Sequence, residues 1–217
     1  MSWTESFITG RRLALTFGLA TLMAASCYAN QDALVKSVGD ALAEGTATRN
    51  QLDATMASLN KLLATPPGND LRPAYQAYVE NVDKTKQDAG ITRKRVDQMN
   101  ADSANYFGTW KSDNEAISNE KLRKVSNKRL ETVQKDYRSS LASLQGAAAK
   151  FTPFLSDLSD IQTALSNDLT ANGLKAAKGV FKKANKDHSE VRKEIDKSTH
   201  TFQAMQTNLM PVAAAPK

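Results

Sequence analysis

The feature that most constrains this chain is a row of apolar residues, three and four positions apart, that continues through almost the whole sequence. Between Ala74 and Thr152 no proline interrupts it. An average spacing near 3.5 residues keeps one side of a helix facing its neighbours, as in left-handed coiled coils. A strand would instead require strict alternation. The sequence therefore predicts an all-α fold with coiled-coil heptads.

Prolines and short polar turns divide this row into segments. Pro66 opens a turn that ends at Asp70, a residue suited to begin a helix. Pro153 lies inside a continuing apolar pattern, so we expect it to kink its helix rather than to end it. The short connections predict antiparallel neighbours in one elongated bundle. The expected long helices are residues 31–64, 71–118, 120–168 and 172–208.

The two middle helices are expected to be longer than the outer two. At about 1.5 Å per residue, the outer helices would measure about 50–55 Å and the middle pair about 70–75 Å. If both outer turns lie at one end, the short helices cannot cover the far end of the long pair. Residues 104–132 are therefore expected to project as a two-helix hairpin.

Many positions in the four apolar seams hold Ala, Thr or Ser instead of Leu. Such residues bury little apolar surface, so each helix is expected to need cover from more than one neighbour. The alternative is that a second copy of the chain completes the seams, which would make the protein a homo-oligomer.

The N-terminus has the three-part layout of a secretory signal. A basic step is followed by an apolar run of about thirteen residues, short of the roughly 20 that a permanent membrane span requires. We expect residues 1–26 to be removed and Cys27, the lone cysteine, to carry a lipid. The alternative is cleavage after Ala29, which would discard Cys27. Residues 27–210 would then form the bundle and residues 211–217 a disordered tail.

Two basic groups are candidates for contact with an anionic lipid surface or an acidic protein. The other interpretation is a solvated helix face. The net charge of +6 is mild, so nucleic acid is not an expected partner. One group begins the third helix: Lys121, Arg123, Lys124, Lys128 and Arg129. The other group lies along the fourth helix: Lys175, Lys178, Lys182 and Lys186.

Three aromatic residues lie where the hairpin is expected to leave the bundle: Tyr106, Phe107 and Trp110. Packing is one role for them, and contact with a partner protein is the other.

Patterns typical of catalysis are missing from the sequence. No glycine begins a nucleotide-binding loop, and neither histidine has the Glu three residues before it that a di-iron bundle requires. His188 falls on an apolar stripe and is expected to be a polar core residue with a local hydrogen bond. Asp157 and Asp160 are expected to lie on a solvated face. We expect neither an enzyme nor a cofactor or metal.

Four stretches resemble, in order and spacing, the bacterial family catalogued as domain of unknown function 2959. They are "ANYFGTWKSDNEAIS", "LRKVSNKRL", "KFTPFLSDLSD" and "SNDLTANGLKAAKG". The resemblance covers about residues 35–209. It implies a secreted, often lipidated, helical envelope protein with no assigned activity, and it supplies no catalytic residues.

Together these features predict a non-enzymatic protein of the bacterial envelope, a scaffold or adaptor in the periplasm that is lipid-anchored to the outer membrane. Its partner would be an envelope protein that the sequence does not name. The alternative function is a peripheral binder of anionic membrane surfaces through the basic helical patches.

Overall fold

The structure is a computed structural model that describes residues 10–66 and 68–210, with side chains from Cys27 onward. The expected tail at 211–217 lies outside the described residues, as do most of the side chains of the expected signal. The described part contains five helices and no strand, which confirms the all-α class. They are α1 (Gly10–Leu63), α2 (Arg72–Glu115), α3 (Glu120–Asn167), α4 (Ala171–Ala176) and α5 (Lys178–Leu209).

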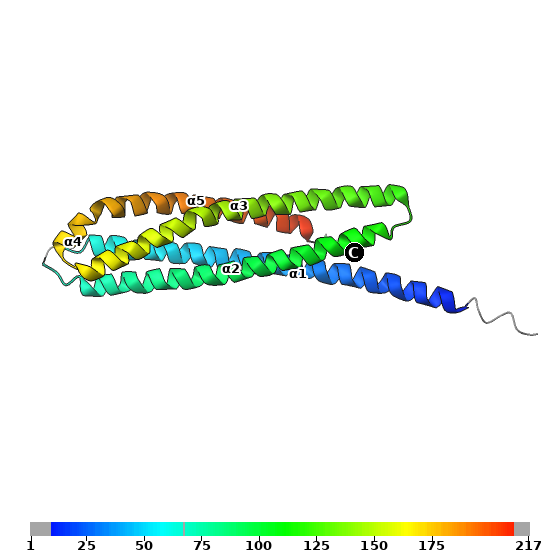
Figure 1. Cartoon of the computed structure of the whole chain (residues 1–217), viewed down its shortest axis with the longest axis horizontal. Coiled ribbons are helices and arrows are strands. Elements are labelled where there is room, and N and C mark those ends of the chain that lie inside the picture. The colour runs from blue at the N-terminus through cyan, green and yellow to red at the C-terminus, as the bar shows by residue number, and fades with distance from the viewer. Residues whose placement is uncertain (1–9, 67, 211–217) are drawn as a thin grey trace, which may run out of the picture.

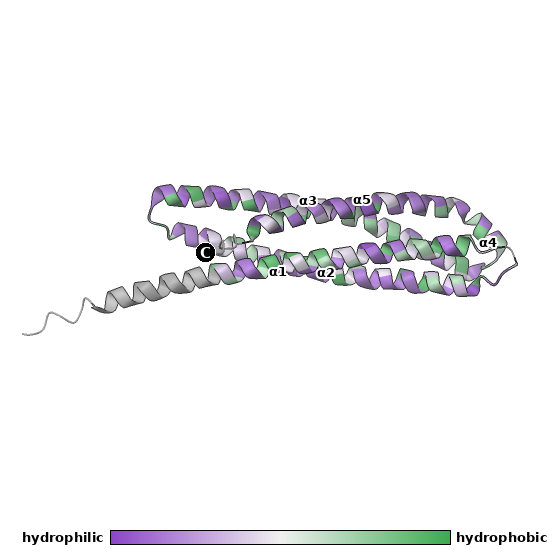
Figure 2. Ribbon diagram, turned by 180° about the vertical axis from the view of Figure 1, so that it is seen from behind, coloured by the Kyte–Doolittle hydropathy of each residue, from purple (hydrophilic) through white to green (hydrophobic). Residues whose placement is uncertain are grey.

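The helices form an elongated antiparallel bundle (Figure 1). Helix α1 packs mainly against α2, and α3 packs mainly against α5. Fewer contacts join α1 to α5 and α2 to α3. The four long helices therefore make two tight pairs that meet side by side. Hydrophilic and hydrophobic residues alternate along each of the long helices (Figure 2).

Two helices differ from their expected bounds. Helix α1 begins at Gly10 rather than near residue 31, because no proline interrupts the chain before Leu63. The expected fourth helix is divided at Ala177 into α4 and α5. A Cβ at Gly173 would lie 2.1 Å from the carbonyl oxygen of Asp168, so the chain passes very close to itself in this turn. Helix α3 continues through Pro153.

The expected projecting hairpin is shorter than predicted, because the other helices accompany its base. Arg129 Nη2 donates to the carbonyl oxygen of Asn208, 3.0 Å away, at the end of α5. Asn30 Nδ2 of α1 donates to Thr109 Oγ1 of α2 at 2.9 Å. Past the end of α5, helices α2 and α3 continue for several helical turns on either side of residues 116–119 (Figure 1).

Two separate clusters of apolar side chains hold the bundle together. The far-end cluster lies near the 64–71 turn and includes Leu52, Tyr78, Phe154, Leu158 and Phe181. The hairpin-end cluster includes Leu34, Met99, Tyr137, Phe202 and Leu209. The apolar core is therefore divided along the length of the bundle.

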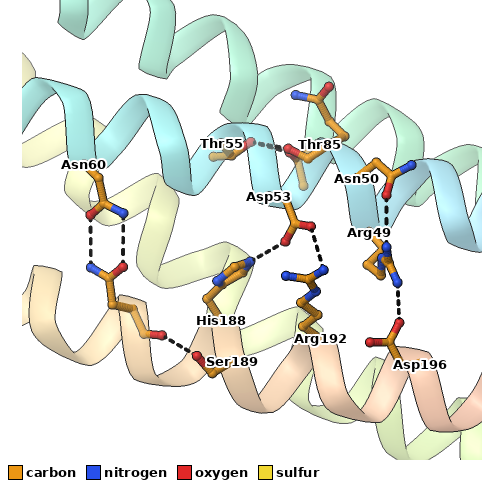
Figure 3. Close-up of polar contacts among 12 residues, drawn as sticks. Arg49, Asn50, Asp53, Thr55, Asn60, Thr85, His188, Ser189, Arg192 and Asp196 are labelled. Carbon is orange, nitrogen blue, oxygen red and sulfur yellow. Dashed lines mark hydrogen bonds and ion pairs between the residues drawn. The ribbon is translucent and has the colours of Figure 1, made fainter.

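A row of polar pairs crosses the interface between α1 and α2. The hydroxyls of Thr55 and Thr85, both completely buried, lie 2.8 Å apart (Figure 3). Thr48 lies 2.8 Å from Thr92 in the same way. Gln51 of α1 donates from Nε2 to the side-chain oxygen of Asn81, one turn before Thr85 on α2, at 2.9 Å. We call these three contacts the polar ladder; they satisfy groups that would be costly to bury alone.

Candidate functional site

Cys27 lies at the end of the bundle that carries the hairpin between α2 and α3. We call this end the hairpin end. It is half-buried and lines a cleft of about 390 Å³ together with Trp110 of α2, Arg129 of α3 and Leu209 of α5. Burial raises the pKa of the Cys27 thiol, and the nearby carboxylate of Asp113 raises it further. The thiol is therefore held neutral beside three other helices.

The three predicted aromatic residues mainly pack. Tyr106 is only 5% exposed, so it belongs to the core and does not offer a surface to a partner. Its ring centre lies 5.4 Å from that of Phe107 and 5.5 Å from that of Trp110. Burial raises the pKa of Tyr106 to about 12. Phe107 and Trp110 are half-buried, and Trp110, like Tyr106, lines the cleft beside Cys27.

A network of polar side chains that the sequence did not reveal joins the two helices of the hairpin. Trp110 Nε1 donates to Ser126 Oγ at 3.1 Å, and Ser126 donates to Asn114 Oδ1 at 2.6 Å. Asn114 Nδ2 in turn donates to Asn127 Oδ1 at 2.7 Å. Asn114 is 2% exposed. The spacing of apolar residues along one helix does not predict these polar pairs. The partners meet only because the chain turns back at residues 116–119.

The five basic residues predicted at the start of α3 remain near the surface. Arg123 donates to the carbonyl oxygen of Ile117, and Arg129 is bound to the end of α5. Within the described residues only Lys124 of the five forms an ion pair, with Glu120 at 2.7 Å. Lys121 and Lys128 are exposed.

Two apolar side chains accompany these lysines. Leu122 is 57% exposed and Val125 is 61% exposed, which is unusual for residues of this type. Val125 lies four positions after Lys121 and three before Lys128, and Leu122 lies three before Val125, so Val125 stands beside these lysines and Leu122 beside Val125. We call this the hairpin-tip surface; it comprises Lys121, Leu122, Lys124, Val125 and Lys128.

The second basic group lies at the opposite end of the bundle, the far end, around α4 (Figure 1). Lys175, Lys178 and Lys182 line a cleft of about 930 Å³ together with apolar residues such as Phe181. Lys186 does not line this cleft, and its Nζ lies 3.9 Å from Glu190. The two predicted basic groups therefore do not share a surface.

His188 has a hydrogen-bonding partner, although not a local one. Its Nε2 lies 2.7 Å from Asp53 Oδ1 on α1, and Arg192 approaches the same carboxylate at 3.6 Å (Figure 3). His188 was predicted to be a core residue with a local hydrogen bond, but it is half-buried and its partner comes from another helix. These contacts join α1 to α5. Neither His188 nor Asp53 lines the clefts at the hairpin end, in the middle or at the far end of the bundle.

The two aspartates set aside in the sequence lie near the surface. Asp160 is exposed, and Asp157 forms an ion pair with Lys183. In the part of the chain that the structure describes, no three His, Cys, Asp or Glu side chains gather as a metal site would require. In that same part, no helix is long and apolar enough to cross a membrane.

These observations define an elongated, antiparallel, all-α bundle with an exposed basic and apolar tip. The model of a protein family described as "Protein of unknown function (DUF2959)" matches residues 21–208. The chain belongs to this family, which confirms the resemblance noted in its sequence. No curated protein and no solved structure matches the chain.

Proposed function

We propose that the protein is a non-enzymatic scaffold or adaptor of the cell envelope that is anchored through a lipid on Cys27. Its hairpin end docks on the anionic surface of that membrane, and its bundle projects into the periplasm. The observation that carries this proposal is that Cys27 and the hairpin-tip surface lie at the same end of the bundle.

The chemistry of the hairpin-tip surface fits a membrane surface better than water. Each lysine near an anionic surface contributes about 1 kcal/mol. Leu122 and Val125 are exposed between these lysines and would gain by entering the apolar boundary of the bilayer. A lipid and a basic patch at one end of the bundle would stabilise attachment together.

The far end is the part of the protein that this arrangement offers to a partner. Helix α3 has 48 residues, which corresponds to about 72 Å. The cleft with Lys175, Lys178 and Lys182 would then lie a full bundle length from the membrane. An envelope protein with an acidic surface is the partner that these lysines favour.

The anchor is tested by cell fractionation of a Cys27→Ser variant with a high-salt wash, because salt removes electrostatic docking but not a lipid. We expect the wild-type protein to stay with the membranes and the variant to be released. A variant that stays after the wash would contradict the anchor.

The docking surface is tested by co-sedimentation of Cys27→Ser protein with anionic and neutral vesicles. A Lys121→Gln/Lys128→Gln variant should lose about 2 kcal/mol, or roughly 30-fold, of its partitioning to anionic vesicles. The matched control is Lys178→Gln/Lys182→Gln, which changes the same charge at the far end. Equal losses in both variants would contradict docking by the hairpin tip.

The alternative is a peripheral binder without an anchor, in which Cys27 is removed with the signal. It predicts that Cys27→Ser changes nothing in cells, while the two lysine substitutions at the hairpin tip release the protein.

A further inference from the structure

The strongest unassigned feature is a cleft in the middle of the bundle, between the two apolar clusters, which we call the waist cleft. Its volume is about 810 Å³. All four long helices contribute walls, among them Gly45, Ala89, Val96, Leu144, Ala148 and Ile195. Its lining is mainly apolar, and its size lies within the range of about 300–1,000 Å³ typical of ligand sites.

The waist cleft is lined by the same apolar seam that closes the bundle at both ends. On α3 the seam residues Val133 and Tyr137 are buried at one end, and Leu158 and Ile161 are buried at the other. The five seam positions between them are half-buried or exposed: Leu141, Leu144, Ala148, Phe151 and Leu155. Ser140, Ala147 and Phe154 are buried instead, so the middle of α3 packs through a different row of residues and leaves the seam residues at the cleft.

Small residues on the opposite helices leave this space open. Gly45 of α1 and Gly90 of α2 both line the cleft, and a Cβ placed on either would meet nothing within 4 Å. An apolar space of this size costs stability, because the side chains around it lose contacts. A ligand that fills it would recover those contacts.

The shape of the waist cleft favours a linear hydrocarbon chain. Leu141 and Leu155 lie 14 positions apart on α3, which is about 21 Å along the helix. A hydrocarbon chain, whose carbons touch at about 3.5–4.0 Å, is much thinner than a helix and can lie along the cleft over that length. A helix from a second copy is the alternative occupant, which the oligomeric state of the ligand-free protein would reveal.

The two charged residues that line the waist cleft, Arg93 and Asp97, both lie on α2. Arg93 is exposed, and within the described residues it forms no ion pair, whereas Arg95 lies 3.9 Å from both Asp40 and Glu44. Asp97 lines the cleft one turn from Arg93. One cation and one anion suit a head group with a single negative charge better than a doubly charged phosphate.

We propose that the waist cleft binds one long-chain fatty acid, with its hydrocarbon chain along the bundle axis and its carboxylate at Arg93. This site is independent of the membrane attachment at the hairpin end. An arginine binds a carboxylate through paired hydrogen bonds, and the seam residues of α3 would cover the chain.

The test is a titration of the purified protein with a fluorescent 16-carbon fatty acid, followed by competition with unlabelled 16-carbon and 8-carbon acids. We expect saturable binding of one molecule per chain, and displacement at least tenfold weaker by the short acid. Absence of saturable binding, or equal displacement by both acids, would overturn the proposal.

Filling the waist cleft should remove the binding. Ala148→Leu is expected to weaken it at least tenfold while raising the melting temperature, since it occupies an apolar void. Ala142→Leu is the matched control, because Ala142 is exposed on the same helix outside the cleft. Gly45→Leu fills the cleft from the opposite wall and serves if the first variant folds poorly. Unchanged binding in either folded variant would overturn the proposal.

The carboxylate contact has a separate readout. Arg93→Gln should weaken binding of the acid several-fold and leave binding of the 16-carbon alcohol unchanged, whereas Lys94→Gln should affect neither. Equal losses for acid and alcohol would overturn the role of Arg93. Sedimentation of the ligand-free protein as a dimer that Ala148→Leu dissociates would overturn the proposal in favour of a second copy.

Discussion

The two ends of the bundle carry similar numbers of lysines but differ in what accompanies them. At the hairpin tip, Lys121 and Lys128 stand beside Leu122 and Val125, which are largely exposed. At the far end the lysines surround a cleft, in which Phe181 is 2% exposed, and Val180 beside them is 45% exposed. The ends therefore differ in how much apolar surface accompanies the lysines, and not in their charge.

The largest expected difference between the ends concerns stability. Leu158→Ala removes a side chain that is completely buried in the far-end cluster, so it should lower the free energy of unfolding by about 2–5 kcal/mol. Leu122→Ala, on the same helix at the hairpin tip, should change it by less than about 0.5 kcal/mol. Urea unfolding measures both. Similar losses would mean that Leu122 is covered in solution.

A smaller effect is expected within the hairpin. Asn114→Ala removes a buried amide and leaves Ser126 and Asn127 without their partner, at a cost of about 1–3 kcal/mol. Hydrogen exchange should become faster between residues 105 and 130 and stay unchanged at the far end. Asn127→Ala, which removes one exposed end of the network, should have a weaker effect; the reverse order would show that Asn114 is not its centre.

The apolar contribution to docking is expected to be about 1 kcal/mol. Leu122→Ser should lower binding to anionic vesicles roughly fivefold, because less apolar surface enters the bilayer. Val180→Ser is the control, since Val180 is 45% exposed at the far end. Co-sedimentation distinguishes them, and a fivefold loss in the control would remove the distinction between the ends.

The last effect concerns alkaline pH. Burial raises the pKa of Tyr106 from 10.0 to about 12. The unfolded chain loses the phenolic proton first, so stability is fully present below pH 10 and falls as the pH rises from about 10 to 12. Tyr106→Phe should flatten this decline in urea unfolding midpoints. A wild-type midpoint that is constant up to pH 12 would contradict it. Burial also raises the pKa of Tyr78, so part of the decline should persist.

The sequence predicted the fold well, because the helices follow from the regular spacing of apolar residues along the chain. The turn after Pro66 and the start of α3 fall within a residue or two of their expected places. The division at Ala177 was not predicted, since it accompanies the close approach of Gly173 to Asp168 in a turn. The early start of α1 was also missed, because the apolar N-terminus was interpreted only as a signal.

The site was less predictable for a related reason. The positions of Lys121 and Lys128 followed from the sequence, but the buried amide of Asn114 depends on a partner across the hairpin. Likewise, the period assigned Leu144 and Ala148 to the seam, and only the four helices together determine whether a seam is closed.

The polar ladder between α1 and α2 has a mechanical consequence. Its pairs include Thr48 with Thr92 and Thr55 with Thr85. Sliding α1 by one helical turn, about 5.4 Å, would separate every pair at once and leave buried groups without partners. A pulling force along the axis of α1 would therefore act on all three contacts of the polar ladder at once. Helices α1 and α2 should therefore resist sliding past each other and transmit a pulling force between the ends of the bundle.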